Sequence, residues 1–357
     1  MVRKFEIKVP ASSANIGPGY DVLGIGLSLY LTLDVSIDPK DVEETNSDPN
    51  NCKLTYTPES EGFDSVPLES DKNLITKTAL YVLRCNDIRT FPTGTKIIID
   101  NPIPLGRGLG SSGAAVVAGV MLGNEVGQLN FSKQRMLDYC LMIERHPDNI
   151  SAAMMGGFVG SFLRDLTPQE VERREIPLSE VLDTPSGGDD TGLTPPLPPT
   201  LISRFIKYNW SEPIRCIAVI PNFEVSTADS RGVLPKAYTV QDLVFNLQRL
   251  AVLTTALTQN PPNPELIYAA MQDRVHQPYR KTLIPGLPEI LQSVTPKTHP
   301  GLLGICLSGA GPTILALATD NFEDIAHEII NQFSKKHISC NWKLLDVANE
   351  GSTVIKK

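Results

Sequence analysis

The stretch PIPLGRGLGSSGAA, residues 102–115, decides the fold of this 357-residue chain. Gly106, Gly108 and Gly110 carry no side chains, which suits a backbone that must approach an anion closely. A helix that begins near Ser111 directs its free N–H groups and the positive end of its dipole to the same place. The stretch therefore predicts a cradle for phosphate groups. The alternative is a tight turn that only packs a helix against a strand.

Two common glycine motifs do not fit this loop. A P-loop requires Gly-Lys followed by Ser or Thr, and the loop contains no such sequence. A dinucleotide-binding G-x-G-x-x-G needs glycine at position 111, which is serine. What remains is a G-L-G-S-S pattern preceded by P-x-x-x-G.

The residues around the loop predict a mixture of strands and helices. A strand is expected at residues 95–100, before the loop, and an apolar helix at residues 113–126, after it. Further strands are predicted at residues 1–10, 22–37, 53–57, 214–221 and 341–347, with two more around the turn 308–312. Further helices are predicted at residues 71–87, 132–145, 241–257 and 321–335. This order favours a two-lobed α+β architecture over a doubly wound parallel sheet.

Residues 167–211 carry the weakest structural signals and include SGGDD and TPPLPPT. We expect the lobe boundary or a long surface excursion there. The predicted division is an amino-terminal lobe of residues 1–175, an excursion of residues 176–212 and a carboxy-terminal lobe of residues 213–357.

Composition excludes several classes of function. The formal net charge is −8 and no long Lys/Arg cluster is present, which argues against nucleic acid or anionic lipid as the main partner. The six cysteines have no paired close spacing, so neither a zinc site nor a disulfide framework is suggested. The first ten residues follow a strand pattern and not that of a signal peptide, and the longest apolar runs are too short to span a bilayer. We expect a cytoplasmic protein.

Several segments, in a fixed order, carry a resemblance to a known family. The glycine loop resembles the phosphate-binding motif of GHMP kinases. Three groups of segments extend the match: VPASSANIGPGYDVLGIGL (9–27) near the amino terminus, HPDNI (146–150), STADSRGVLP (226–235) and HQPYRKTLIPG (276–286) in the middle, and LSGAGPTILAL (307–317) near the carboxyl terminus. Together they resemble the homoserine kinase family, in its fungal type, over most of the chain except residues 38–70 and 180–212.

The resemblance implies a fold and an activity. The fold is the two-lobed GHMP kinase fold, with an amino-terminal lobe like ribosomal S5 domain 2 and a ferredoxin-like carboxy-terminal lobe. The activity is ATP-dependent phosphorylation of the L-homoserine hydroxyl, with Mg²⁺, in threonine biosynthesis, by a homodimer. Two alternatives stay open: another GHMP kinase acting on mevalonate or a sugar, and a catalytically silent sensor that keeps the fold.

The resemblance also implies which residues hold ATP and the metal. Ser112 and Glu144 are expected to hold Mg²⁺, which takes one or two protein oxygens besides phosphate and water. Asp138 is a substitute for Glu144, and an ion pair with Arg145 is the structural alternative for that glutamate. Asn73 is assigned to adenine, with a helix N-cap as its alternative. The expected phosphate contacts come from Pro104, Leu105, Gly106, Arg107, Gly108, Leu109, Gly110, Ser111 and Ser112.

The remaining assignments concern the amino-acid substrate. By resemblance, Arg231 and Arg280 hold its carboxylate, a task for which the guanidinium fork is suited. The ammonium and hydroxyl end is lined by Asn15, Asp21, His146, Asp148 and Asn149. Thr227, Asp148 and Asn149 are expected to take part in catalysis. If the segment after Ser226 begins a helix, Thr227 and Arg231 project from one face. No general base is assigned, because the substrate proton can pass to phosphate directly or with help from Asp148.

Overall fold

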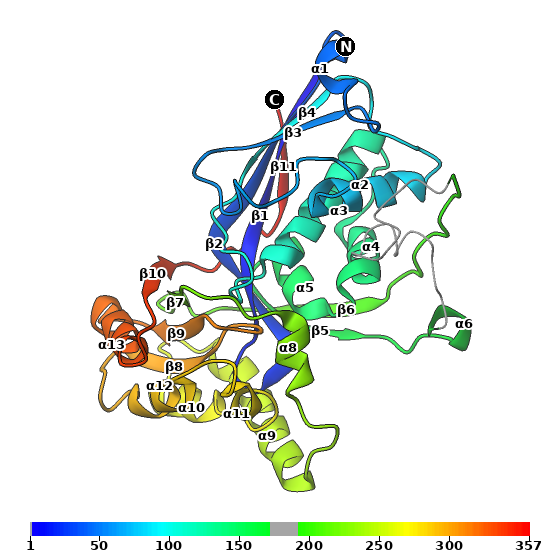
Figure 1. Cartoon of the computed structure of the whole chain (residues 1–357). Helices are drawn as coiled ribbons and strands as arrows, with labels where there is room; N and C mark the ends of the chain where they lie inside the picture. Colours follow the sequence, from blue (N-terminus) through cyan, green and yellow to red (C-terminus); the bar gives the residue numbers. More distant parts are fainter. Residues whose placement is uncertain (1, 172–191) are drawn as a thin grey trace.

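The computed structural model describes residues 2–171 and 192–357. Figure 1 shows two sheets, each with helices packed against it. The first sheet has the spatial order β11 (Thr353–Lys356), β1 (Arg3–Asn15), β2 (Gly19–Ile37), β4 (Thr95–Asp100) and β3 (Cys52–Tyr56), with β5 (Phe158–Leu163) paired to β2 and β6 (Ser203–Tyr208) paired to β5. The β3–β4 pair is parallel and the other strand pairs of the two sheets are antiparallel. The predicted α+β class is confirmed.

β1 and β2 form a long hairpin that reaches into the site. The predicted strands at residues 1–10 and 22–37 are confirmed, and the structure extends them through residues 11–15 and 19–21. Register shifts after Pro10 and Ala14 bend the pair. The connection needs only three residues because Asn15, Gly17 and Asp21 adopt left-handed backbone conformations with φ of 68°, 56° and 56°.

Helices cover one side of the first sheet. These are α2 (Leu74–Arg84), α3 (Ser111–Gly127), α4 (Lys133–Glu144) and α5 (Pro147–Met155). α3 and α5 lie against β1 and β2, and α2 and α4 pack against α3. Ser132 caps the predicted helix α4, since its side chain accepts a hydrogen bond from the Arg135 N–H.

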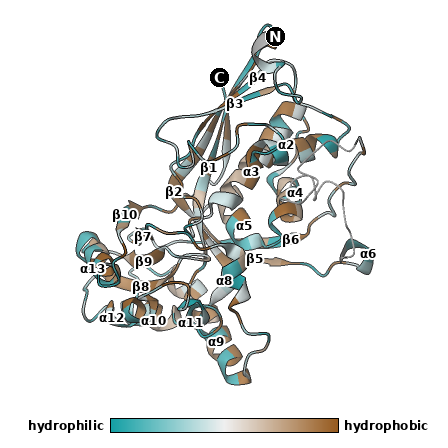
Figure 2. Ribbon diagram, in the orientation of Figure 1, coloured by the Kyte–Doolittle hydropathy of each residue, from teal (hydrophilic) through white to brown (hydrophobic). Residues whose placement is uncertain are grey.

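The second sheet has the spatial order β10 (Cys340–Leu345), β7 (Arg215–Pro221), β9 (Ile314–Ala318) and β8 (Leu302–Leu307). Numbered along the chain, the four strands lie in the order 4-1-3-2, as the predicted ferredoxin-like lobe requires. β8 and β9 are buried along their whole length, and Figure 2 shows their apolar residues in brown. The surrounding helices are α8 (Thr227–Gly232), α9 (Val240–Ala256), α10 (Pro264–Ala270), α11 (Gln277–Arg280), α12 (Leu287–Ser293) and α13 (Phe322–Ser334).

The predicted division of the chain differs from the structure in two places. The expected excursion of residues 176–212 contains β6, an edge strand of the first sheet. This strand was not predicted because it is half-exposed and directly follows a proline-rich stretch. The strand predicted at residues 341–347 is not the last one, because the short β11 returns to pair with β1. Residues 172–191, which end the predicted amino-terminal lobe and begin the excursion, lie outside the described residues.

Two short helices, α1 (Val42–Thr45) and α6 (Pro168–Val171), complete the described structure. Within residues 2–171 and 192–357, no helix combines the length and apolarity that crossing a bilayer requires.

Candidate active site

The glycine loop lies between β4 and α3. α3 begins at Ser111, as predicted, and its N-cap is Gly110, which has φ of 68° and provides no side-chain cap. The first N–H groups of α3 are therefore left for another acceptor. A Cβ on Gly110 would lie 2.2 Å from Ser12 Oγ, and one on Gly108 would lie 2.4 Å from the Ser308 carbonyl oxygen. The glycines thus let the loop pack against two other segments as well as leave room for an anion.

Those two segments are the amino-terminal and carboxy-terminal motifs, which meet at the loop. Ser308 Oγ lies 2.7 Å from Ser13 Oγ and donates a hydrogen bond to the Gly108 carbonyl at 2.6 Å. Gly309 N donates to the Ala14 carbonyl at 3.0 Å. Our sequence predictions missed the two serines, although both stand inside the quoted motifs.

A cavity of about 100 Å³ opens beside the glycine loop. It is lined by Gly106, Arg107, Gly108, Gly110, Ser111, Ser112, Gly113, Glu144, His146, Asn149, Val225, Thr227, Gly309 and Ala310. Pro104, Leu105 and Leu109 of the predicted phosphate loop do not line it. Arg107 Nε is buried and has no hydrogen-bond partner within the described residues. Because the Arg107 side chain also lines the cavity, it brings a positive charge to the place where an anion would bind.

Two oxygen donors face each other in the cavity. Ser112 Oγ donates a hydrogen bond to Glu144 Oε1 at 2.5 Å, so the serine hydroxyl at the start of α3 meets the carboxylate at the end of α4. These hard oxygens suit Mg²⁺, which needs few protein ligands when phosphates are also present. The described residues contain no group of three or more His, Cys, Asp or Glu side chains arranged for a metal.

Asp138, the substitute metal ligand, has a different role. Its side chain is buried and accepts hydrogen bonds from the backbone N–H groups of Leu201 and Ile202 and from Arg135. It anchors the segment that leads into β6. Asp138 is thus occupied by contacts within the protein and does not line the cavity, and Glu144 stays the predicted metal ligand.

His146 lies between two carboxylates at the start of α5. Its Nδ1 is 3.2 Å from Asp148 Oδ1 and its Nε2 is 3.4 Å from Glu144 Oε2. Burial alone would lower the pKa of His146, but the hydrogen bond and charge of Asp148, together with the charge of Glu144, raise this pKa above its ordinary value. Asp148 Oδ1 also accepts from the Asn149 N–H, and Asn149 Oδ1 accepts from Ser12 Oγ.

Arg231 is paired with a residue that we had assigned to the opposite end of the substrate. Its guanidinium donates two hydrogen bonds to the Asp21 carboxylate, at 2.8 and 3.1 Å, and one to the Tyr20 hydroxyl at 3.0 Å. α8 begins at Thr227 with Ser226 as its cap, so the predicted helical spacing of Thr227 and Arg231 is confirmed. Thr227 lines the cavity and Arg231 follows one turn later.

Arg280 is held in a different way, inside the protein. The residue is only 2% exposed, and Nη1 contacts the Gly309 carbonyl at 2.7 Å and His276 Nδ1 at 3.0 Å. The central guanidinium carbons of Arg231 and Arg280 each lie 5.6 Å from the centroid of the Tyr20 ring. The two predicted carboxylate-binding arginines therefore share one neighbourhood.

Two asparagines serve the protein's own backbone. Asn15 accepts from the Asp21 N–H and donates to the Gly309 carbonyl, so it orders the β1–β2 turn. Asn73 is buried and caps α2, and its amide nitrogen donates hydrogen bonds to the Tyr56 hydroxyl and the Pro67 carbonyl. A contact between Asn73 and adenine would require these bonds to be exchanged, and it stays a prediction.

Comparisons with known proteins agree on one family. The models for the GHMP kinase N-terminal domain and the GHMP kinase C-terminal region match residues 73–157 and 255–336. The chain is 78% identical to the homoserine kinase of Saccharomyces cerevisiae over 99% of both chains, and 54% identical to that of Schizosaccharomyces pombe, also over 99% of both. The chain belongs to the homoserine kinase family of GHMP kinases. The crystal structure of homoserine kinase from Cytophaga hutchinsonii shares the fold, with a TM-score of 0.74, 24% identity and coverage of 99% of this chain and 98% of that one.

Within this homoserine kinase family member, the predicted site residues fall into two adjoining groups. One lines the cavity and includes Ser112, Glu144 and Thr227. The other surrounds Tyr20 and includes Arg231 and Arg280. Gly309 joins them, because this residue lines the cavity and its carbonyl accepts hydrogen bonds from both Asn15 and Arg280.

Proposed function

We propose that this chain transfers the γ-phosphoryl group of ATP to the side-chain hydroxyl of L-homoserine, giving O-phospho-L-homoserine and ADP, a step of threonine biosynthesis. One observation carries the proposal: a phosphate-sized cavity at a helix start adjoins a cluster that holds both signs of charge, Arg231 and Arg280 with Asp21. The curated relatives that are named homoserine kinase support it.

The phosphate side uses backbone and one cation. The uncapped N–H groups at the start of α3 and the positive end of its dipole attract the triphosphate. Arg107 lines the same cavity and adds a positive charge to it. These groups are in place before phosphoryl transfer, as electrostatic stabilisation of the transition state requires.

Ser112 and Glu144 are the residues that would hold Mg²⁺. The cation, when bound, would neutralise negative charge on the phosphates. The serine hydroxyl and the glutamate carboxylate lie within 2.5 Å of one another, so binding replaces their mutual hydrogen bond.

The substrate side matches the two charges of an amino acid. The carboxylate of homoserine takes the place of Asp21 on the Arg231 fork, and its ammonium group takes the place of Arg231 at Asp21. Both protein charges then keep a partner. A substrate with a carboxylate but no ammonium group, such as mevalonate, leaves Asp21 without its cation. This exchange favours a zwitterion.

Thr227, Asp148 and Asn149 act near the transferred group. Thr227 and Asn149 line the cavity, while buried Asp148 fixes the start of α5 by its hydrogen bonds to His146 and the Asn149 N–H. Positioning of the hydroxyl in line with phosphorus and charge neutralisation supply most of the rate. The hydroxyl proton passes to phosphate directly or with help from Asp148.

A coupled ADP-release assay tests the proposal. L-Homoserine, mevalonate, galactose and L-threonine are compared at equal concentrations, with the Glu144→Ala variant as the background for contaminating ATPases. We expect kcat/KM for homoserine to exceed the others by about 100-fold, because a site built for several hydrogen bonds rejects ligands that lack them. A preference for mevalonate or galactose would indicate another GHMP kinase. ATP binding by folded protein without ADP release would indicate the silent sensor.

A homodimer and a cytoplasmic location are further proposals. The homodimer follows from the family resemblance, and the location follows from the cysteine spacing and the absence of a signal-peptide pattern in the first ten residues. Sedimentation equilibrium of the purified protein and fluorescence microscopy of a tagged chain are the measurements that check them.

A further inference from the structure

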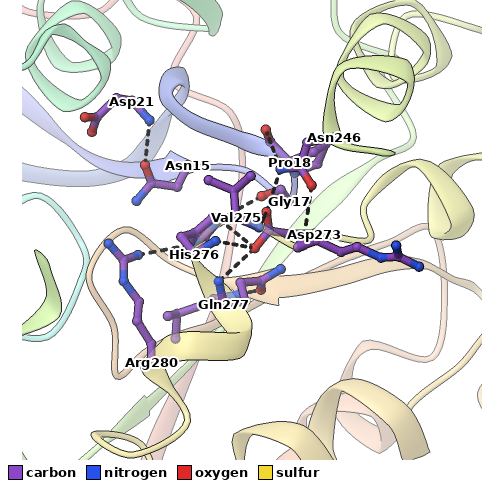
Figure 3. Close-up of polar contacts among 12 residues, drawn as sticks. Asn15, Gly17, Pro18, Asp21, Asn246, Asp273, Val275, His276, Gln277 and Arg280 are labelled. Carbon is purple, nitrogen blue, oxygen red and sulfur yellow. Dashed lines mark hydrogen bonds and ion pairs between the residues drawn. The ribbon is translucent and has the colours of Figure 1, made fainter. Parts of the chain in front are cut away.

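A buried polar network lies beneath the amino-acid side of the site, between α9, α11 and the β1–β2 turn (Figure 3). Its members are Asn246, Asp273, His276, the Gly17 and Pro18 carbonyls and Arg280. The side chains of Asp273 and His276 are 0% exposed. Neither residue lines the cavity, and the proposed mechanism uses neither.

Asp273 fixes the position of α11. Its carboxylate accepts hydrogen bonds from the backbone N–H groups of Val275, His276 and Gln277 at 2.9, 3.0 and 2.7 Å, and from Asn246 Nδ2 at 2.7 Å. Four donors compensate the buried negative charge. The start of the segment that carries His276 and Arg280 is thereby held rigidly against α9.

The two ring nitrogens of His276 have partners of opposite kinds. Nδ1 lies 3.0 Å from Arg280 Nη1, and a guanidinium nitrogen can only donate. Nε2 lies 2.8 Å from the Gly17 carbonyl oxygen, which can only accept. Both contacts are satisfied by one form alone, the neutral imidazole with its proton on Nε2. A protonated ring would set two donors, on His276 and on Arg280, against each other.

Arg280 depends on this arrangement for its orientation. Its Nη1 is shared between His276 and the Gly309 carbonyl, and Nε lies 3.4 Å from the Ser230 carbonyl. Its Nη2 makes no hydrogen bond to the residues that the structure describes. In Figure 3 the Arg280 guanidinium lies to the left of His276, below Asn15 and Asp21.

We propose that His276 is a positioning residue for the amino-acid substrate: its Nδ1 orients the Arg280 guanidinium, while its Nε2–H holds the β1–β2 turn that carries Asn15 and Asp21. The proposal rests on the proposed homoserine phosphorylation. His276 never touches the substrate. Through one ring it sets the relative placement of a carboxylate-binding group from one lobe and an ammonium-binding turn from the other.

Three substitutions separate the two bonds. His276→Leu removes both. His276→Asn can place its amide oxygen near the Nδ1 position and so keep the Arg280 bond. His276→Gln can place its amide nitrogen near the Nε2 position and so keep the Gly17 bond. His337→Asn, at an exposed histidine on the surface with φ of 60°, is the matched control.

We expect His276→Leu to raise the KM for homoserine about 10- to 100-fold, the equivalent of losing a hydrogen bond to a charged group. The KM for ATP should change less than about 3-fold, since the phosphate side is built from other elements. His276→Asn should recover most of the loss, His276→Gln less, and His337→Asn should match the wild type. If His276→Leu does not fold, the ratio of the homoserine KM values of the Gln and Asn variants decides.

A double-mutant cycle with Arg280→Lys tests whether His276 acts on homoserine binding through Arg280. If His276 acts through Arg280, the two losses are not additive, because the second substitution finds the interaction already broken. Additive losses, an unchanged homoserine KM in a folded His276→Leu variant, or equal increases in both KM values would overturn the proposal. A wild-type protein that does not phosphorylate homoserine would instead overturn the proposed function, which the first assay reports separately.

Discussion

Arg231 and Arg280 lie near the same tyrosine ring but are held in different ways. Arg280 is buried, and its partners are a carbonyl oxygen and a neutral imidazole, so no charge has to leave when a substrate arrives. Arg231 belongs to a partly exposed ion pair with Asp21, and a substrate must replace that carboxylate. The two arginines together form a clamp for the substrate carboxylate. Arg280 is the preset half of this clamp, and Arg231 is the half whose partner is exchanged when the substrate binds.

The same contrast holds on the phosphate side. The uncapped start of α3 is fixed by the backbone, whereas the hydrogen bond between Ser112 and Glu144 must be replaced by the metal. Preset groups contribute affinity without reorganisation. Exchanged pairs contribute selectivity, because only a ligand that satisfies both partners compensates for the broken contact.

The largest expected effect concerns the exchanged pair on the phosphate side. Glu144→Ala should lower kcat/KM by on the order of 100- to 1,000-fold at limiting Mg²⁺, as expected for loss of a group that stabilises transition-state charge. Ser112→Ala should act in the same direction with a smaller loss. Activity is titrated against Mg²⁺ concentration, with thermal unfolding to confirm the fold. Asp138→Asn is the comparison: a stronger magnesium defect there than in Glu144→Ala would contradict our metal assignment.

The next effect concerns the preset arginine. Arg280→Lys keeps the charge but loses the planar fork, so kcat/KM for homoserine should fall by about 100-fold, equivalent to roughly 2–3 kcal/mol. The KM for ATP should barely change. Both constants come from steady-state kinetics at saturating co-substrate. A parallel loss of ATP affinity would assign Arg280 to phosphate binding or to folding.

The exchanged arginine should give a smaller loss and a different signature. Arg231→Lys should lower kcat/KM for homoserine by about 10-fold, since Asp21 and Arg231 are partly exposed and their pairing is worth little in water. Asp21→Asn should relax the preference for the ammonium group. The test compares homoserine with analogues that lack the ammonium or the carboxylate. If Arg231→Lys loses homoserine and the carboxylate-free analogue equally, the exchange model is wrong.

A variant of the glycine loop is a poor test of nucleotide binding. Because a Cβ on Gly108 meets the Ser308 carbonyl at 2.4 Å, Gly108→Val displaces the loop from the carboxy-terminal lobe as well as from phosphate. Arg107→Ala is the sharper change, since the side chain lines the cavity and its Nε has no partner among the described residues. We expect about a 10-fold weaker affinity for a non-hydrolysable ATP analogue, measured by calorimetry.

Sequence predicted the parts of the molecule that are local in the chain. The strand, glycine loop and helix at residues 95–127 follow from local pattern, and residues of the loop and of later motifs line one cavity. β6 and β11 were missed because an edge strand and a four-residue strand carry little pattern of their own.

The network under Arg280 could not be predicted in the same way. His276 stood in a quoted motif, but its partners are Gly17, more than 250 residues earlier, and the arginine four residues later. Only the folded chain gives the two ring nitrogens opposite partners. The local signal available was Asp273, because an aspartate can accept hydrogen bonds from backbone N–H groups a few residues later in the chain.

The smallest expected effect is on stability as a function of pH. The contributions of His276 and His146 to the free energy of unfolding should change in opposite directions as the pH rises. Burial lowers the pKa of His276, against the charge of Asp273, whereas the carboxylates of Asp148 and Glu144 outweigh burial and raise the pKa of His146. The neutral form of His276 thus stabilises the fold fully above its ordinary pKa of about 6.5, and that contribution is lost as the pH falls. The contribution of charged His146 is present below about pH 6.5 and is lost as the pH rises through its raised pKa.

Substituting either histidine should therefore remove its own contribution to the pH dependence of Tm, and the two contributions have opposite signs. Between pH 7 and pH 5, the Tm of the wild type should fall more than that of His276→Asn, while between pH 6 and pH 8 it should fall more than that of His146→Asn. We expect differences of about 1–3 °C, the size that roughly 1 kcal/mol or less produces in a protein of this length. Differential scanning calorimetry in matched buffers measures both. The charged and titratable groups that face His276 are Asp273, Arg280, Asp21 and Tyr20, and they are unchanged in the comparison.

A His276→Asn variant whose Tm follows the wild type at every pH would mean that this histidine protonates freely in the folded protein. In that case its Nδ1 would not be reserved for Arg280, and the preset half of the clamp would be no more fixed than the exchanged one.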